Sequence, residues 1–263
     1  MKKVIVLAIA AILLAAAPTP RVLKLATTTS AQSSGILDYL LPLFEAKNNV
    51  KVQVIAEGTG KALKTAEDGN ADLVLVHAVK LEEEFVAQGF GVKRIPIMRN
   101  DFILVGPASD PAGIKGKNGV ESFQLIKDKG ALFISRSDQS GTYIKEMEMW
   151  GYVGGAPTKN RLEIGQGMEQ ALRMADEKSA YTLTDRATYL ALRKSLKLGP
   201  LNGPCPLFEN IYSVIATNPA KWPSVNNKDA QALIDWLSGP EGQKAIAAFA
   251  IDGEHPFTPI AGK

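Results

Sequence analysis

Three short segments of small and hydroxyl residues each lie between a strand-like run and a helix-like run. They occupy residues 27–30, 58–60 and 135–142. Hydroxyl groups, the free backbone N–H groups of a first helical turn and the helix dipole together attract negative charge. The spacing therefore predicts loops that hold an oxyanion.

The third segment carries the most hydrogen-bond donors. Arg136 can place two parallel N–H groups on two oxygens of one anion. Ser140, the Gly141 amide and Thr142 add neutral donors where the next helix begins. Asp138 would repel a bound anion, so we expect it to hold the Arg136 side chain from the side. The alternative is an ordinary helix cap, with Ser140 as the capping residue and Arg136 in solvent.

The first two segments also have simpler explanations. Threonine is β-branched, so Thr27, Thr28 and Thr29 are equally typical of an exposed strand end ahead of a helix. The second segment does not match the phosphate-binding loop, because Ile55 stands where that motif needs a glycine. It is typical of a strand-to-helix turn, in which Thr59 and nearby amides are available as donors.

The residue types give little support to other chemistry. The chain has two histidines, His77 and His255, and a single cysteine, Cys205; they lie far apart in sequence, which disfavours a zinc site. His77 follows a strand and is most simply a packed, hydrogen-bonded residue. An enzyme acting on phosphate esters would need a general base or a metal beside the loops. The sequence offers no such set of residues, so we expect a binding protein without cofactor and without directly ligated metal.

The N-terminus has the character of an export signal. Lys2 and Lys3 precede an apolar run at residues 4–17 that is too short to span a bilayer and ends in alanines. We expect residues 1–17 to be removed on export to a bacterial periplasm. No cysteine lies near the cleavage site, so we expect no lipid anchor. Loss of the two lysines lowers the formal charge from +3 to +1. With basic and acidic residues interspersed, that value disfavours nucleic acid as a partner.

The elements that must position the loops follow an α/β pattern. Residues 50–55 alternate with a β-branched bias, and residues 72–76 form an apolar run that suits a buried parallel strand. Helix-like segments separate the strands, which predicts sheets with helices on their faces. The expected strands are 22–26, 50–55, 72–76, 101–107, 131–135, 180–184 and 211–216. The expected helices are 36–47, 62–68, 81–88, 123–129, 141–150, 168–177, 185–195, 229–237 and 241–249.

An ordered set of segments extends through nearly all of the chain after the export signal. It consists of residues 25–30, 35–42, 58–60, 71–78, 100–102, 106–107, 110–114, 135–142, 180–186 and 235–237. This set resembles the solute-binding proteins of bacterial tungstate importers, the TupA type of periplasmic binding protein. Each fragment alone is modest evidence for this resemblance, whereas the ordered set is specific to it.

The resemblance implies a fold and partners. The fold is α/β and two-lobed, a type II-like periplasmic binding protein in which each lobe is a mixed sheet flanked by helices. Two hinge crossings are expected, near residues 102–105 and 207–212. Lobe one would comprise residues 22–104 plus 210–263, and lobe two residues 105–209. A ligand would lie between the lobes, and the closed form, expected to be a monomer, would dock on an ABC transporter permease in the membrane.

The resemblance also implies which residues hold the ligand, expected to be tungstate, with molybdate or phosphate as the alternative. Phosphate-binding proteins of this superfamily use an aspartate after a lobe-one strand to accept the proton of phosphate. Here that point falls near His77, which favours a fully ionised metal oxyanion. The expected ligand donors are Thr28, Thr29, Thr59, Arg136, Ser140, Gly141 and Thr142. A second tier comprises Thr27, Ser30, Gly60, His77, Asp138 and Tyr181.

Overall fold

Strands and helices alternate along the chain, as the sequence predicts. The computed structural model describes residues 19–138 and 140–262, so the expected export signal lies outside the described residues. The strands are β1 (Arg21–Thr28), β2 (Val50–Glu57), β3 (Leu73–Val76), β4 (Ile95–Gly106), β5 (Phe133–Ser135), β6 (Arg161–Glu163), β7 (Tyr181–Asp185), β8 (Gly199–Pro200), β9 (Glu209–Ala216) and β10 (Thr258–Pro259). The helices are α1 (Thr29–Ser33), α2 (Ile36–Asn48), α3 (Thr59–Glu67), α4 (Val79–Ala87), α5 (Gly119–Asp128), α6 (Gly141–Tyr152), α7 (Met168–Glu177), α8 (Arg186–Leu192), α9 (Asn227–Ser238) and α10 (Pro240–Ala248), with 3₁₀ turns η1 (Arg193–Ser195) and η2 (Pro206–Phe208).

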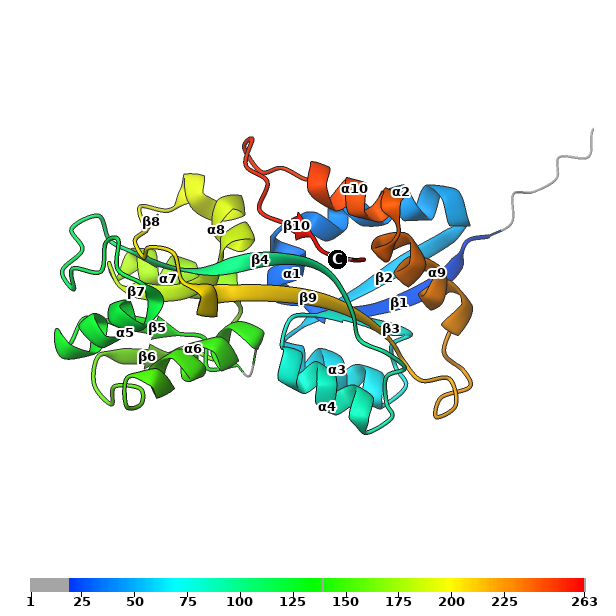
Figure 1. The fold of residues 1–263 in the computed structure, drawn as a ribbon, viewed down its shortest axis with the longest axis horizontal. Helices are drawn as coiled ribbons and strands as arrows, with labels where there is room; N and C mark the ends of the chain where they lie inside the picture. Colours follow the sequence, from blue (N-terminus) through cyan, green and yellow to red (C-terminus); the bar gives the residue numbers. More distant parts are fainter. Residues whose placement is uncertain (1–18, 139, 263) are drawn as a thin grey trace, which may run out of the picture.

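The strands of the described residues form a mixed sheet in the order β2-β1-β3-β9-β4-β7-β5-β6. At one end β1 pairs in parallel with β2 and β3, and at the other β5 pairs in parallel with β6 and β7. Helices cover both faces at each end (Figure 1). We call the end with α1–α4, α9 and α10 lobe one, and the end with α5–α8 lobe two. The expected two-lobed α/β architecture is confirmed.

Two long antiparallel strands, β4 and β9, connect the lobes (Figure 1). Met98 of β4 packs in the core of lobe one, whereas Phe102, four residues later, packs in the core of lobe two. On β9, Phe208 at the preceding turn belongs to the second core and Tyr212 to the first. Each strand therefore changes core within a few residues, and both do so at the same level of the sheet.

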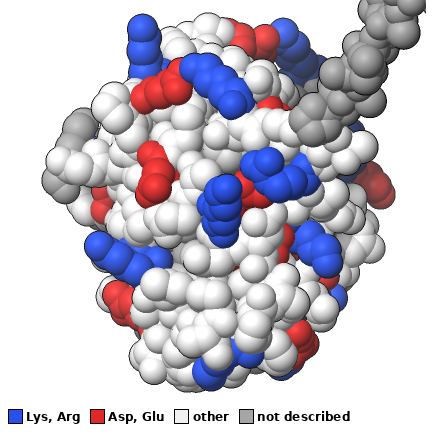
Figure 2. Space-filling view, turned by 90° about the vertical axis from the view of Figure 1, so that its right-hand side faces the viewer, with Lys and Arg blue, Asp and Glu red and all other residues white. Residues whose placement is uncertain are grey.

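The surface of the described residues is mixed in charge. On the face shown in Figure 2, basic and acidic residues are interspersed, without a continuous patch of either sign. None of the helices between residues 19 and 262 has the length and apolar character that crossing a membrane requires.

Candidate oxyanion-binding site

Each of the three predicted loops precedes a helix. Thr28 ends β1 and caps α1, accepting a hydrogen bond from the Ala31 N–H at 3.1 Å. Gly58 is the N-cap of α3, which begins at Thr59. Ser140 caps α6 and accepts from the Tyr143 N–H at 3.2 Å. All three loops therefore end in a first helical turn, as the sequence predicts.

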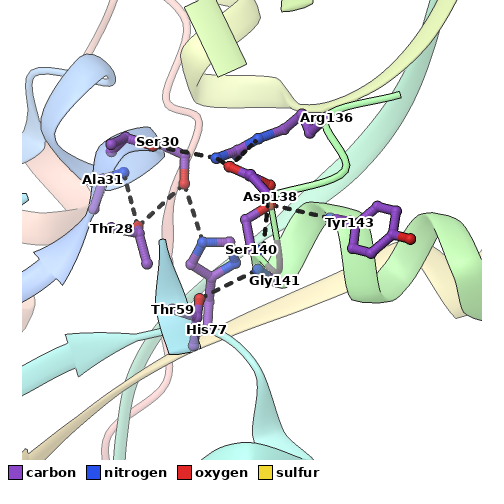
Figure 3. Close-up of polar contacts among 11 residues, drawn as sticks. Thr28, Ser30, Ala31, Thr59, His77, Arg136, Asp138, Ser140, Gly141 and Tyr143 are labelled. Atoms are coloured by element: carbon purple, nitrogen blue, oxygen red, sulfur yellow. Dashed lines mark hydrogen bonds and ion pairs between the residues drawn. The ribbon is translucent and has the colours of Figure 1, made fainter. Parts of the chain in front are cut away.

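The loops of the two lobes meet directly (Figure 3). The Gly141 N–H of lobe two donates to Thr59 Oγ1 of lobe one at 3.2 Å, and Arg136 Nη2 donates to Thr29 Oγ1 at 3.3 Å. A Cβ on Gly58 would lie 3.3 Å from the Asp138 carbonyl oxygen, so this glycine permits the close approach. The two lobes are therefore in a closed arrangement. We call the contact between the first two loops and the loop at 135–142 the seam, and the expected donors lie there.

Arg136 is the buried cation of the seam. Its side chain is 2% exposed, and Nε donates to Asp138 Oδ2 at 3.1 Å while Nη2 pairs with the same oxygen. Asp138 Oδ1 accepts from the Ser140 N–H at 3.2 Å. Ser137 adopts a left-handed backbone with φ of 50°, which turns the loop so that the two charged side chains face each other. The prediction that Asp138 holds Arg136 is confirmed, and the alternative with Arg136 in solvent is wrong; the capping role of Ser140 holds as well.

The second-tier candidates separate into two groups. Ser30 lies between Thr28 and His77, with Oγ 3.1 Å from Thr28 Oγ1 and 3.0 Å from His77 Nε2. Thr27, in contrast, is turned into the sheet, where its hydroxyl donates to the Leu75 carbonyl at 2.7 Å. Gly60 lies inside the first turn of α3. The structure thus brings Ser30 and His77 to the seam and directs the Thr27 side chain away from it.

Tyr181 is also placed elsewhere. Its ring is buried in the core of lobe two, and its hydroxyl donates to Asp110 Oδ1 at 2.8 Å and accepts from the Ala112 N–H at 2.9 Å. These partners hold a turn behind the sheet. Tyr181 begins β7, whereas the residues near the seam are at the other end of that strand.

Thr142 supplies a buried polar atom that the protein itself does not satisfy. It is 2% exposed, and its Oγ1 has no hydrogen-bond partner among the described residues. A buried hydroxyl without a partner is costly in free energy. This hydroxyl, at the start of α6, fits the donor set that an oxyanion requires.

The electrostatics of the seam centre on Arg136. Burial lowers the pKa of His77 to about 4. The hydrogen bond to Asn210 opposes this shift, and the positive charge of Arg136 adds to it. Burial raises the pKa of Asp185, opposed by its bonds to Thr188 and by the Arg136 charge. At neutral pH the His77 ring is therefore uncharged, and the loops of lobe one present neutral groups to the seam.

Sequence reasoning missed the polar residues behind the loops. Asn100, Asn210, Asp185 and Thr188 are all buried and hydrogen-bonded behind Ser30 and His77. The two asparagines gave no local signal, because Asn100 lies between Arg99 and Asp101 and Asn210 follows Glu209, so each looks like part of an exposed polar stretch. Among residues 19–138 and 140–262, no group of three His, Cys, Asp or Glu side chains is placed to hold a metal ion.

Comparison with known proteins assigns the family. Residues 15–241 match the family model of the PBP superfamily domain. A "Putative ABC transporter anion-binding protein" of Haloferax volcanii is 46% identical over 91% of this chain and 72% of its own length. The "Tungstate-binding protein TupA" of Peptoclostridium acidaminophilum is 42% identical over 91% of this chain and 86% of its own. The chain belongs to the TupA type of the PBP superfamily.

Solved structures support the fold of this TupA-type chain. The tungstate ABC transporter structure from Geobacter sulfurreducens is 52% identical, covers 87% of this chain and 98% of its own, and superposes with a TM-score of 0.81. The tungstate-binding protein TupA from Desulfovibrio alaskensis is 39% identical, covers 92% and 99%, and has a TM-score of 0.79. The relatives named here are anion- and tungstate-binding proteins of ABC transporters, so the TupA-type chain is a binding protein and not an enzyme.

Proposed function

We propose that this protein is a periplasmic receptor that captures tungstate between its lobes and delivers it to an ABC transporter permease. The names of the relatives support the ligand class. The observation that carries the proposal is the seam itself. There the buried guanidinium of lobe two meets hydroxyl groups and helix N-termini that come from both lobes.

The proposed donors are Thr29 and Thr59 from lobe one, and Arg136, Ser140, Gly141 and Thr142 from lobe two; Thr28 caps the helix that begins at Thr29. Tungstate is a dianion at neutral pH and carries oxygen acceptors only, so it requires donors on every side. Charge-assisted hydrogen bonds in a dehydrated seam contribute roughly 1.5–3 kcal/mol each. Because the donors come from both lobes, the anion stabilises the closed arrangement by its differential affinity for it.

Monoprotonated phosphate fits this donor set less well than a metal oxyanion. Its P–OH group needs an acceptor, and the residue directly after β3 is His77, whose Nε2 faces Ser30. Asp138 is the carboxylate nearest the Arg136 head group, and both of its oxygens already accept hydrogen bonds. Molybdate shares the charge and shape of tungstate and remains the second candidate ligand.

The remaining parts of the proposal concern the path of the ligand. In this proposal residues 1–17 direct export and are removed, and the mature receptor acts as a monomer. The lobe boundaries stay as proposed from the sequence, 22–104 plus 210–263 and 105–209, with crossings near residues 102–105 and 207–212. Support comes from the change of core between Met98 and Phe102 on β4, and between Phe208 and Tyr212 at β9.

A calorimetric titration of the mature protein with tungstate, molybdate, phosphate and sulfate tests the proposal. We expect tungstate to bind most tightly, with weaker or equal binding of molybdate and little heat from phosphate and sulfate. The melting temperature should rise with tungstate concentration, because a ligand that binds only the folded state stabilises it. Binding of phosphate alone would overturn the proposal.

A further inference from the structure

A continuous path of hydrogen bonds leads from the first loop into the hinge. Ser30 Oγ lies 3.0 Å from His77 Nε2, and His77 Nδ1 lies 2.9 Å from Asn210 Oδ1. Asn210 Nδ2 donates to Asn100 Oδ1 at 2.7 Å, and Asn100 Nδ2 donates to Asp185 Oδ1 at 3.4 Å. These five side chains are buried. We call this series the hinge chain.

The hinge chain passes through the point where the strands change lobes. Asn100 of β4 and Asn210 of β9 are direct partners in the antiparallel ladder. Asp185 belongs to lobe two, where it caps α8 by accepting from the Thr188 N–H at 2.9 Å. The Thr188 hydroxyl donates to the Ser30 carbonyl at 3.3 Å. A ring of contacts therefore joins the first loop, both hinge strands and lobe two.

The bonds of the hinge chain have a fixed direction. Asp185 Oδ1 accepts from a backbone N–H, so it faces the NH₂ group of Asn100. The Asn100 oxygen then accepts from the NH₂ group of Asn210, whose own oxygen faces His77. The proton of the neutral imidazole must accordingly be on Nδ1, which leaves Nε2 as an acceptor. Ser30 then donates its single hydroxyl proton to His77.

The His77 ring also touches the loop of lobe two. A Cβ on Gly141 would lie 3.1 Å from Nδ1 and Cε1 of His77, so the ring packs against the first residue of α6 (Figure 3). The ring also stacks on Tyr212, with centroids 4.6 Å apart. It therefore contacts both a hinge strand and Gly141, whose amide we propose as an anion donor.

We propose that His77 is a positioning residue for oxyanion binding. It accepts a hydrogen bond from the Ser30 hydroxyl and holds the two loops in place relative to the hinge. The inference rests on the proposed function. In this arrangement neither the Ser30 nor the Thr28 hydroxyl donates to the anion: the Ser30 oxygen accepts the Thr28 hydroxyl proton, and Thr28 keeps the first loop at the seam. The contact that depends on closure is the one beside the hinge chain, in which the Thr188 hydroxyl of lobe two donates to the Ser30 carbonyl of lobe one.

The first test compares two histidine variants. His77→Phe keeps a ring for the stack on Tyr212 and removes both nitrogens. His255→Phe is the matched control, since His255 is the other histidine of the chain and bonds to the Phe249 carbonyl instead. In calorimetric titrations with tungstate, we expect the Kd of His77→Phe to rise at least about ten-fold, as for loss of one or two buried hydrogen bonds. The Kd of His255→Phe should equal that of the wild type.

An unchanged Kd in folded His77→Phe would overturn the inference. Wild-type protein that binds none of the four oxyanions would instead overturn the proposed function. A purely structural role of His77 predicts a lower melting temperature with the wild-type Kd, so the two measurements separate positioning from packing.

A second test needs no variant. Nitrogen-15 NMR of the wild-type imidazole at pH 7 should show the His77 proton on Nδ1 and an unprotonated Nε2. A proton on Nε2 would contradict the direction of the hinge chain.

A third test probes the continuity of the chain. Asn100→Ala removes a member that does not touch His77. We expect the losses of tungstate binding free energy in Asn100→Ala and His77→Phe to be non-additive. The Kd of the double variant should be close to that of the single variant that binds tungstate more weakly. Additive losses would overturn the connection between them.

Discussion

The two lobes contribute opposite kinds of chemistry to the same seam. Lobe one presents neutral hydroxyls at Thr29 and Thr59, backed by the uncharged His77 ring. Lobe two presents a guanidinium held by a carboxylate, in Arg136 and Asp138. The cation that a dianion requires therefore lies on one side only. In the proposed site neither lobe alone holds a complete donor set, so we expect the affinity to depend on closure.

The largest expected effect comes from removing the charged side of this pair. Arg136→Ala deletes the guanidinium and leaves Asp138 without its cation next to the ligand. Loss of two charge-assisted hydrogen bonds should weaken tungstate binding by about 10²–10⁴-fold. Calorimetry on the purified variant measures the effect.

Arg173→Ala is a suitable control for Arg136→Ala, because Arg173 also belongs to lobe two but forms an exposed pair with Glu169. Its Kd should match that of the wild type. Tight tungstate binding by a folded Arg136→Ala protein would show that the charge asymmetry does not drive affinity.

The neutral His77 of lobe one should make the free energy of unfolding depend on pH. Burial lowers the pKa of His77 to about 4, against an ordinary value of 6.5. Between these values the unfolded chain binds a proton that the folded chain does not, so the free energy of unfolding falls as the pH drops. By pH 4.5 the loss from this group should reach roughly 2–3 kcal/mol.

Denaturant unfolding of the wild type and of His77→Phe at pH 7 and 4.5 isolates this contribution. Buried acids such as Asp185, whose pKa is raised, act in the opposite direction in both proteins. The stability difference between wild type and variant should narrow at the lower pH. A constant difference would mean that His77 is not the neutral group of lobe one.

A smaller effect is expected at the contact between the lobes. Thr59→Val removes a hydroxyl whose oxygen accepts from the Gly141 N–H at 3.2 Å and whose proton, in the proposed site, is donated to the anion. The tungstate Kd should rise about ten-fold, the loss expected for one buried hydrogen bond. Thr65→Val is the control on the same helix, since its hydroxyl bonds to Glu57 instead. Equal affinities in the two variants would exclude Thr59 from the donor set.

Local features of the site were predictable from sequence, whereas features that depend on pairing across the fold were not. Loop residues near a strand end and a helix start interact with close sequence neighbours, as Arg136 does with Asp138 and Ser140 with Tyr143. The buried hinge chain joins residues more than a hundred positions apart, as in the bond between Asn210 and Asn100. No local pattern specifies such a partner.

The strands show the same division. The parallel strands β1, β2 and β3 follow their apolar patterns, but β4 begins at Ile95, six residues before the predicted start at 101. Pro96 argues against a strand there, because it cannot donate to the ladder. The structure accommodates it with a shift of register between Pro96 and Met98. Strand β6 is three residues long and carries too little pattern to be detected.

The smallest effect is expected inside lobe two, at a residue that the sequence placed in the site. Tyr181→Phe removes a hydroxyl that bonds to Asp110 and to the Ala112 N–H, away from Arg136. The free energy of unfolding should fall by about 1 kcal/mol, the net value of a typical buried hydrogen bond. The tungstate Kd should stay at the wild-type value, because the contribution of lobe two comes from the loop at 135–142. Weaker tungstate binding with unchanged stability would show that Tyr181 belongs to the binding site, and that the contribution of lobe two extends along β7.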